Sequence, residues 1–200
     1  VEGGQSAIII DAGVMFAEER ELGVGLLLPN LAYLEENRLK LEGIVLTHAH
    51  EDHIGALSYL LRRFFAPVYG TEVTLAFARR GLAEDGFAGA DLRWLHPGVE
   101  IELGSFRVEA VRVTHSTPDS VALAIRTPAG LIVHSGDFKI DPTPVDGQLF
   151  DTERFAQLGD EGVALLLSDS TNVDRPGRSG SESSMRPVLQ DLIKRTRGRF

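Results

Sequence analysis

The apolar positions of this chain fall into short runs separated by glycine, proline and polar residues. Runs rich in Ile, Val and Leu predict strands at 7–11, 43–47, 66–70, 99–103, 106–114, 121–127, 130–135 and 163–168. Apolar residues at helical spacing predict helices at 54–65, 72–85 and 182–196. Turn residues at 103–105 and 127–130 predict hairpins between neighbouring strands. Strands that alternate with helices in this way are typical of a packed α/β fold.

Several of the predicted strands end in side chains that can bind a metal ion. Asp11, His115 and Asp137 each close an apolar run that is rich in β-branched residues. Another strand leads into the segment Thr47-His48-Ala49-His50-Glu51-Asp52-His53. Scaffolds of this kind carry their reactive polar groups along one rim, because those groups stand at the ends of strands. We therefore expect these side chains to meet in the folded protein.

The segment at 47–53 contains three imidazoles and two carboxylates within seven residues. Zn²⁺ binds His nitrogen at ~2.0–2.1 Å and carboxylate oxygen at ~2.0–2.2 Å, usually with four or five ligands. His48 and His50 are two residues apart, so on an extended chain they point the same way. Asp52 and His53 follow once the chain has turned, and they can face a second ion. The alternative interpretation is a solvated, charged loop that opens a helix.

The order of these motifs resembles the hydrolase motifs of the metallo-β-lactamase fold. Four stretches are more specific and resemble ribonuclease J, a family of β-CASP nucleases: residues 45–57, 114–120, 134–141 and 167–172. The similarity extends to 68–71, Pro176-Gly177 and Ser181-Glu182, and so covers almost the whole chain. Other hydrolases of this fold share the His-x-His-x-Asp-His motif, but they are not expected to carry the Asp-Ser-Thr-Asn stretch at 169–172.

The resemblance implies a fold and a domain organisation. The fold would be the metallo-β-lactamase αββα sandwich, of the α/β class, followed by the start of a β-CASP domain. An incomplete catalytic domain would occupy 1–170, and the truncated β-CASP part 171–200. A ribonuclease J-like chain would be longer at both ends, so we expect this sequence to be a fragment that is inactive or nearly so by itself.

We expect the metal ligands to divide into two groups. His48, His50 and His115 would hold a first zinc ion. Asp52 and His53 would hold a second, and Asp137 would bridge the two. A bridging carboxylate partly neutralises two dications that lie within ~3.5–4 Å of each other. Mn²⁺ or another divalent ion can replace zinc in a His and carboxylate site, because metal availability often decides which ion is bound.

The same hypothesis assigns roles to the carboxylates. A water between the two ions, with its pKa brought toward ~7, would attack a phosphodiester phosphorus. Asp52, Asp137 and Asp169 are the expected catalytic residues, and Asp169, which matches the first β-CASP motif, would position the water or relay a proton. Asp11 would orient the metal-ligand loop by hydrogen bonds.

Composition and charge limit the remaining possibilities. The chain has 200 residues, 43% of them hydrophobic, and no cysteine, so disulfides and thiolate ligands are excluded. No apolar run approaches the ~18–20 residues of a membrane span, and we expect a cytoplasmic protein. The chain carries a net charge of −9, yet residues 172–200 hold seven basic and three acidic residues. This tail is either a solvated helix face or a track for RNA.

Three classes of function fit these observations. The leading one is a zinc-dependent ribonuclease that acts on RNA as a 5′-exonuclease, an endonuclease or both, and that can form a homo-oligomer in a full-length parent. The second is another hydrolase of the same fold, acting on thioesters or lactones, and the third is a non-catalytic RNA-binding or assembly subunit. The intact ligand set argues against the third class, and the stretch at 169–172 argues against the second.

Overall fold

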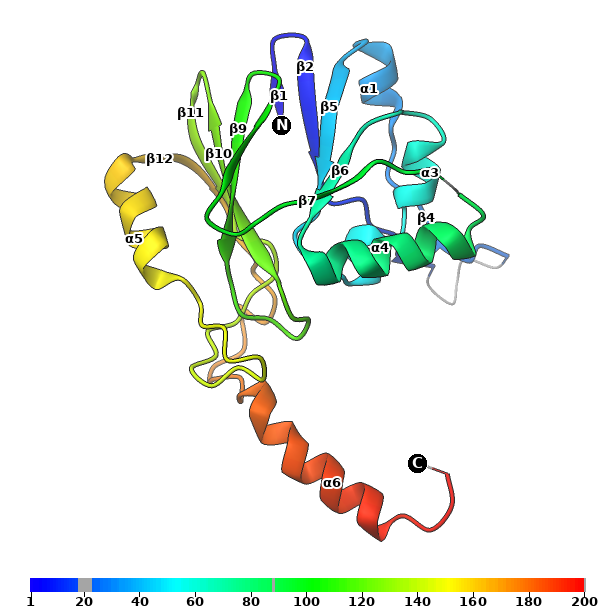
Figure 1. The fold of residues 1–200 in the computed structure, drawn as a ribbon, viewed down its shortest axis with the longest axis vertical. Coiled ribbons are helices and arrows are strands. Elements are labelled where there is room, and N and C mark those ends of the chain that lie inside the picture. The colour runs from blue at the N-terminus through cyan, green and yellow to red at the C-terminus, as the bar shows by residue number, and fades with distance from the viewer. Residues whose placement is uncertain (18–22, 88, 200) are drawn as a thin grey trace.

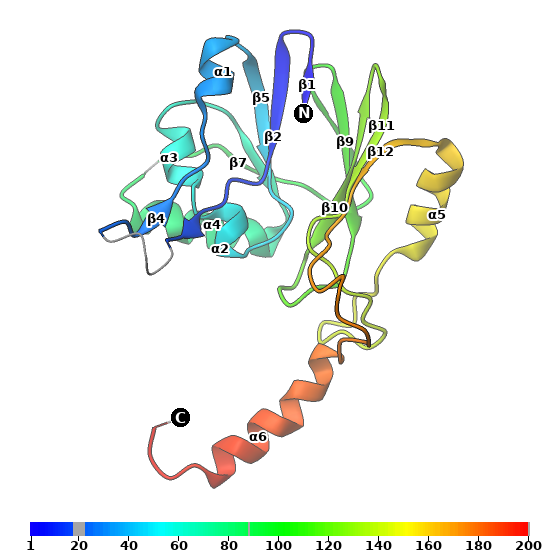
Figure 2. The same ribbon diagram turned by 180° about the vertical axis from the view of Figure 1, so that it is seen from behind.

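The computed structural model describes residues 1–17, 23–87 and 89–199, and its centre is a pair of β-sheets packed face to face (Figures 1 and 2). The first sheet has the order β1-β2-β5-β6-β7 and the second the order β12-β11-β10-β9-β8. The interface between them is a dry core that includes Ile8, Val45, Phe106, Leu123 and Ile125, each no more than 1% exposed. Apolar residues on the inner faces of both sheets therefore hold the two layers together.

The first sheet is mostly parallel. Its strands are β1 (Glu2–Gly3), β2 (Ser6–Ile10), β5 (Lys40–Val45), β6 (Val68–Gly70) and β7 (Leu92–Trp94). Strands β2, β5, β6 and β7 run in the same direction, and only β1 is antiparallel to its neighbour. The carboxyl ends of β2 and β5 consequently lie at one edge, where Ile10 pairs with Val45. Strand β7 was not predicted, because its three residues, of which two are exposed, show no alternation.

The second sheet is antiparallel except at one edge. It contains β8 (Glu100–Leu103), β9 (Phe106–Arg112), β10 (Val121–Thr127), β11 (Gly130–His134) and β12 (Val163–Leu167). The two predicted hairpins are confirmed, since β8 pairs with β9 and β10 with β11 across the expected turns. Strand β12 adds in parallel to β11. Strands β9, β11 and β12 therefore end at one common edge.

Helices cover the outer faces of the two sheets (Figures 1 and 2). On the first sheet lie α1 (Ala32–Glu36), α2 (Glu51–Ile54), α3 (Leu57–Leu61) and α4 (Glu72–Glu84). On the second lies α5 (Thr152–Glu161), which buries Leu158 and packs Phe155 against the sheet. Helix α5 was missed by the sequence analysis because only a few of its positions are apolar. Helix α1 and the short hairpin of β3 (Met15–Phe16) and β4 (Leu26–Leu27) lie in a segment that was expected to be a loop.

The predicted helix at 54–65 was wrong in its extent, because it is broken into α2 and α3. In a continuous helix the Ala56 amide would bond to the carbonyl of Asp52, but it donates to the Ala12 carbonyl at 2.7 Å. The Ala12 amide in turn donates to the His53 carbonyl at 2.6 Å. The chain that follows β2 is thus inserted into the hydrogen-bond ladder and splits the helix.

The segment after β12 leaves the body of the fold. A short 3₁₀ helix, η1 (Glu182–Ser184), is capped by the Ser181 side chain and leads into α6 (Met185–Arg195). Helix α6 extends away from the two sheets and buries none of its residues (Figures 1 and 2). The predicted helix at 182–196 is therefore present as two pieces. The proposed domain boundary at 170/171 stays a prediction. In the described ranges of the chain, every helix is too short or too polar to traverse a lipid bilayer.

Candidate metal centre

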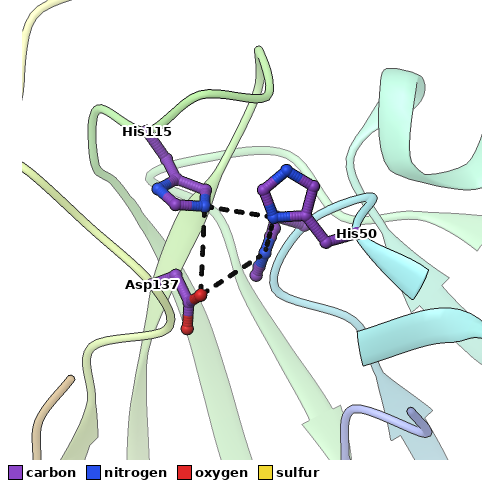
Figure 3. Close-up of side chains that lie close together, drawn as sticks. His50, His115 and Asp137 are labelled. Carbon is purple, nitrogen blue, oxygen red and sulfur yellow. Dashed lines mark hydrogen bonds and ion pairs between the residues drawn. The ribbon is translucent and has the colours of Figure 1, made fainter. Parts of the chain in front are cut away.

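Four side chains converge at the edge where the carboxyl ends of β5, β9 and β11 lie. His48, His50, His115 and Asp137 each offer one ligand atom, and these atoms lie within 4.8 Å of one another. Nδ1 of His50 lies 3.0 Å from Nε2 of His48 and 3.2 Å from Nε2 of His115. Oδ2 of Asp137 lies 3.9 Å from Nε2 of both His48 and His115. Figure 3 shows His115 and Asp137 facing His50 from the opposite sheet.

The donor set of this cluster fits a divalent cation. Ligands at ~2.0–2.1 Å around a tetrahedral zinc ion lie about 3.3 Å from one another, close to the spacing of these ring nitrogens. Nδ1 of His50 lies 3.0 Å from one ring nitrogen and 3.2 Å from another. One shared proton cannot satisfy all three nitrogens. A cation satisfies all of their lone pairs at once.

A second group of ligands lies on the other side of Asp137. Nε2 of His53 is 3.4 Å from Oδ1 of Asp137 and 3.7 Å from Oδ2 of Asp52. The two oxygens of Asp137 therefore face two different groups of ligands. The side chain of Asp52 is 68% exposed, so this second group is more open to solvent than the first. Such an arrangement is suited to two cations that share one carboxylate.

Thr47 and Asp11 connect one histidine from each group. With Nε2 of His48 turned to the other ligands, Nδ1 carries the ring proton and donates to Oγ1 of Thr47 at 2.9 Å. That hydroxyl donates to Oδ2 of Asp11 at 2.8 Å, and Nδ1 of His53 donates to the same oxygen at 2.7 Å. The Thr47 amide donates to Oδ1 of Asp11 at 2.8 Å. These bonds leave Nε2 free as the ligand atom of both histidines.

Thr47→Val should weaken metal binding at the His48 group by about 10–100-fold, because it removes the hydroxyl that accepts the His48 proton but keeps the shape of the side chain. The buried Nδ1–H would then lack a partner, which costs about 1–3 kcal/mol in the free energy of unfolding. Competition with a chromophoric chelator measures the affinity. Thr47→Ser is the control and should bind metal like the unchanged protein; equal affinities for all three proteins would remove Thr47 from the site.

The remaining nitrogen of His50 also has a partner. Its Nε2 lies 3.2 Å from Oγ of Ser116, in the loop that follows β9. Since Nδ1 of His50 faces the other ligands, Nε2 carries the proton and donates it to Ser116. The sequence analysis missed this role of Ser116, and its position one residue after His115 was the only available signal.

Burial keeps the central histidine neutral. Burial, and secondly the charges of the neighbouring histidines, lower the pKa of His48 to about 2. The pKa of His115 is also lowered, by burial and by the charge of His50. Burial alone would lower the pKa of His53, but its hydrogen bond to Asp11 and the charges of the nearby carboxylates raise it above the usual value. Neutral imidazoles at His48 and His115 are the form that binds a metal ion.

Asp169 follows β12 and lies in the same cavity as His115 and Asp137. Burial opposes the ionisation of its carboxyl, but hydrogen bonds from the Thr171 and Phe138 amides outweigh burial and lower the pKa of Asp169. Its own amide donates to the hydroxyl of Ser135 at 2.8 Å. The carboxylate is therefore held ionised at the edge of the cluster.

The segment at 47–53, which carries several of the possible ligands, packs closely against the residues that follow β2. Asp11 has a positive φ of 59°, which Asp tolerates better than most residues. A Cβ atom built on Gly13 would lie 1.6 Å from the carbonyl oxygen of Asp52, so no larger residue fits there. Gly136 is similarly confined, since its Cβ would lie 2.8 Å from the carbonyl oxygen of Val121 and its φ is 57°. Glycine at 13 lets the backbone that follows β2 approach α2 at Asp52 and His53.

Within the described residues, Glu51, Trp94 and His134 do not belong to the cluster of four possible ligands. Glu51 is exposed, and Trp94 is 54% exposed with its ring 4.0 Å from that of His96. His134 is half-buried, and its Nδ1 accepts a hydrogen bond from the Gly136 amide at 3.1 Å. His134 thus supports the turn that presents Asp137.

Known ribonucleases J are similar to this chain over almost its whole length. The chain is 46% identical to a ribonuclease J of Synechocystis sp. over 196 residues, which are 96% of this chain and 31% of that protein. It is 44% identical to a ribonuclease J of Helicobacter pylori, covering 100% of this chain and 29% of that protein. The predicted resemblance is thereby confirmed, and the chain spans about a third of the length of these curated relatives.

The fold is matched independently. A crystal structure of a protein of unknown function from Enterococcus faecalis superposes with a TM-score of 0.63 at 20% identity and covers 96% of this chain and 52% of that chain. The profile described as "Metallo-beta-lactamase superfamily" matches residues 1–174. The predicted fold class is therefore confirmed. The chain belongs to the metallo-beta-lactamase superfamily.

Proposed function

We propose that this chain carries the metal-dependent catalytic site of a ribonuclease that hydrolyses RNA phosphodiester bonds. The observation that carries the proposal is Asp137, whose two oxygens face two separate groups of ligands. The similarity to ribonuclease J supports RNA as the substrate, rather than a thioester or a lactone.

The residues have separate tasks in this proposal. His48, His50 and His115 would hold one divalent cation, and Asp52 and His53 would hold the other, with Asp137 shared between them. Two bound cations would supply hydroxide at neutral pH and offset the negative charge that develops on the phosphoryl oxygens. Zinc fits these nitrogen and oxygen ligands, and Mn²⁺ or another divalent ion is an alternative.

Asp11, Thr47 and Asp169 position protons and orient the reacting groups. Asp11 and Thr47 hold the ring protons of His53 and His48 on Nδ1. Asp169 is ionised and lines the cavity beside Asp137, so it can orient the attacking water or accept a proton from it. In the hydrolysis, a bond forms between the water oxygen and phosphorus, the bond to the leaving oxygen breaks, and a proton ends on the leaving oxygen.

The test uses the natural gene product that contains these residues. Its metal content is measured, the metal is removed with a chelator, and the cleavage of labelled RNA is followed before and after Zn²⁺ or Mn²⁺ is restored. Linear and circular RNA of one sequence distinguish the modes, since only an endonuclease can open a circle. A protein that binds two ions and hydrolyses thioesters, but leaves 5′-monophosphorylated RNA intact, would refute the proposal. Our expectation that these 200 residues alone are inactive or nearly so is tested in the same assay.

Asp11→Asn should lower the rate of RNA hydrolysis by about 10–100-fold while much of the metal remains bound. Asparagine retains the shape and tolerates the positive φ of this position, but the amide supplies a weaker acceptor to His53 and Thr47. Turnover and metal content are measured on the same preparation. A fully active Asp11→Asn protein would leave Asp11 with a structural role only.

A further inference from the structure

A cavity of about 490 Å³ continues from the metal-binding cluster toward the segment after β12. His115 and Asp137 form one wall, and residues 171–172 and 175–179 form another. Both Arg175 and Arg178 line this second wall. A ligand with one group at the metal cluster therefore also meets these two arginines.

The wall that carries the arginines is fixed at both ends. At its start, the Asp169 amide bonds to Oγ of Ser135 at 2.8 Å. At its end, the Glu182 amide donates to Oδ2 of Asp141 at 2.9 Å, and Oγ of Ser181 donates to the Thr143 carbonyl at 2.8 Å. Two anchors in the segments that follow β11 thus hold the loop beside the cavity.

The lining of the cavity carries three acidic residues, Asp137, Asp169 and Glu182, and three basic residues, Lys139, Arg175 and Arg178. Of its acidic residues, Asp137 and Asp169 belong to the metal centre, and Glu182 is paired with Lys139. Arg175 and Arg178 are exposed, and within residues 1–17, 23–87 and 89–199 neither forms an ion pair. Two guanidinium groups that form no ion pair in the described part of the chain therefore share a cavity with a site that we propose to act on a phosphodiester.

We propose that Arg175 and Arg178 bind backbone phosphates of the RNA strand that neighbour the reacting phosphate. The guanidinium group presents planar pairs of N–H donors that match phosphate oxygens, and it remains charged at all relevant pH values. The inference rests on the proposed function and extends it, because it assigns the strand's path across the protein. Contacts of this kind add affinity and orientation without reading base sequence.

The salt dependence of RNA binding tests this assignment. The natural gene product is titrated with a short single-stranded RNA in a chelator, where no cleavage occurs, at several salt concentrations. Each of Arg175→Ala and Arg178→Ala should weaken binding by about tenfold and reduce the slope of log K against log salt by about 0.7, the value for one lost phosphate contact on a single strand. Arg→Lys at either position should retain the slope, since the charge remains.

Arg186→Ala is the matched control, because Arg186 is an exposed arginine of the same segment on α6 that does not line the cavity. It should leave both affinity and slope unchanged. Unchanged slopes for the Arg175 and Arg178 variants, or an equal change for Arg186→Ala, would overturn the inference. So would a loss confined to RNA with a 5′-phosphate and absent with a 5′-hydroxyl, since that points to a terminal phosphate. If the unchanged protein neither binds nor cleaves RNA, the proposed function itself fails.

Discussion

Asp137→Ala should abolish RNA hydrolysis and lower the metal content together. The carboxylate faces both sets of ligands, with Oδ2 toward His48 and His115 and Oδ1 toward His53. Without it, the two dications that we propose would lose the negative charge that lies between them. We expect the bound metal to fall from two ions toward one per chain, and the rate to fall on the order of 10³-fold, because several kcal/mol of transition-state stabilisation are lost.

Metal analysis by mass spectrometry and turnover of labelled RNA measure the two effects on one sample. Asp160→Ala serves as the control, because Asp160 is an exposed carboxylate on α5, far along the chain from the ligands. It should retain both ions and full activity. Full metal occupancy in the Asp137→Ala protein would contradict the bridging role, even if the rate fell.

Gly13→Ala should have the largest effect of any change that adds a single methyl group. The new Cβ would lie 1.6 Å from the Asp52 carbonyl oxygen and 2.2 Å from its carbon, so the two backbones must separate. That separation breaks the hydrogen bonds that Ala12 makes with His53 and Ala56. We expect the free energy of unfolding to fall by about 3 kcal/mol, the upper range for overpacking, and Tm to fall by about 6–12 °C.

The displaced turn carries Asp52 and His53, so the second metal should bind more weakly in the same variant. Calorimetry measures Tm, and metal titration measures the affinity. Gly159→Ala is the matched control, since that glycine lies in α5 with nothing within 4 Å of the added atom. It should stabilise the protein by up to about 1 kcal/mol, because alanine is the better helix former. A Gly13→Ala protein with unchanged Tm and metal affinity would show that the turn can move at little cost.

The chemistry of the site was readable from local sequence. Apolar runs that end in His or Asp identify strand ends, and the spacing of His48 and His50 requires only the two-residue period of an extended chain. The hairpin at 103–105 was equally local, since its turn residues and flanking strands lie within one short segment. Interactions over a few residues are encoded by the residues themselves.

Other features were not predictable from such patterns. The break between α2 and α3 depends on Ala12, more than forty residues away, entering the hydrogen-bond ladder. Gly55 stands at the break as the C-cap of α2, but Leu57, Leu60 and Leu61 continue the helical spacing beyond it.

The sequence by itself determined which ligands are available, the order of the motifs and the strand end on which each motif lies. Only the tertiary structure decided that Ile10 pairs with Val45, so that Asp11 meets Thr47. Only the tertiary structure also decided that β9, β11 and β12 end together, which brings His115, Asp137 and Asp169 to one edge. The physical reason is that pairing register and the packing of two sheets are set by contacts between distant segments, and a side chain's direction within its own strand does not encode them.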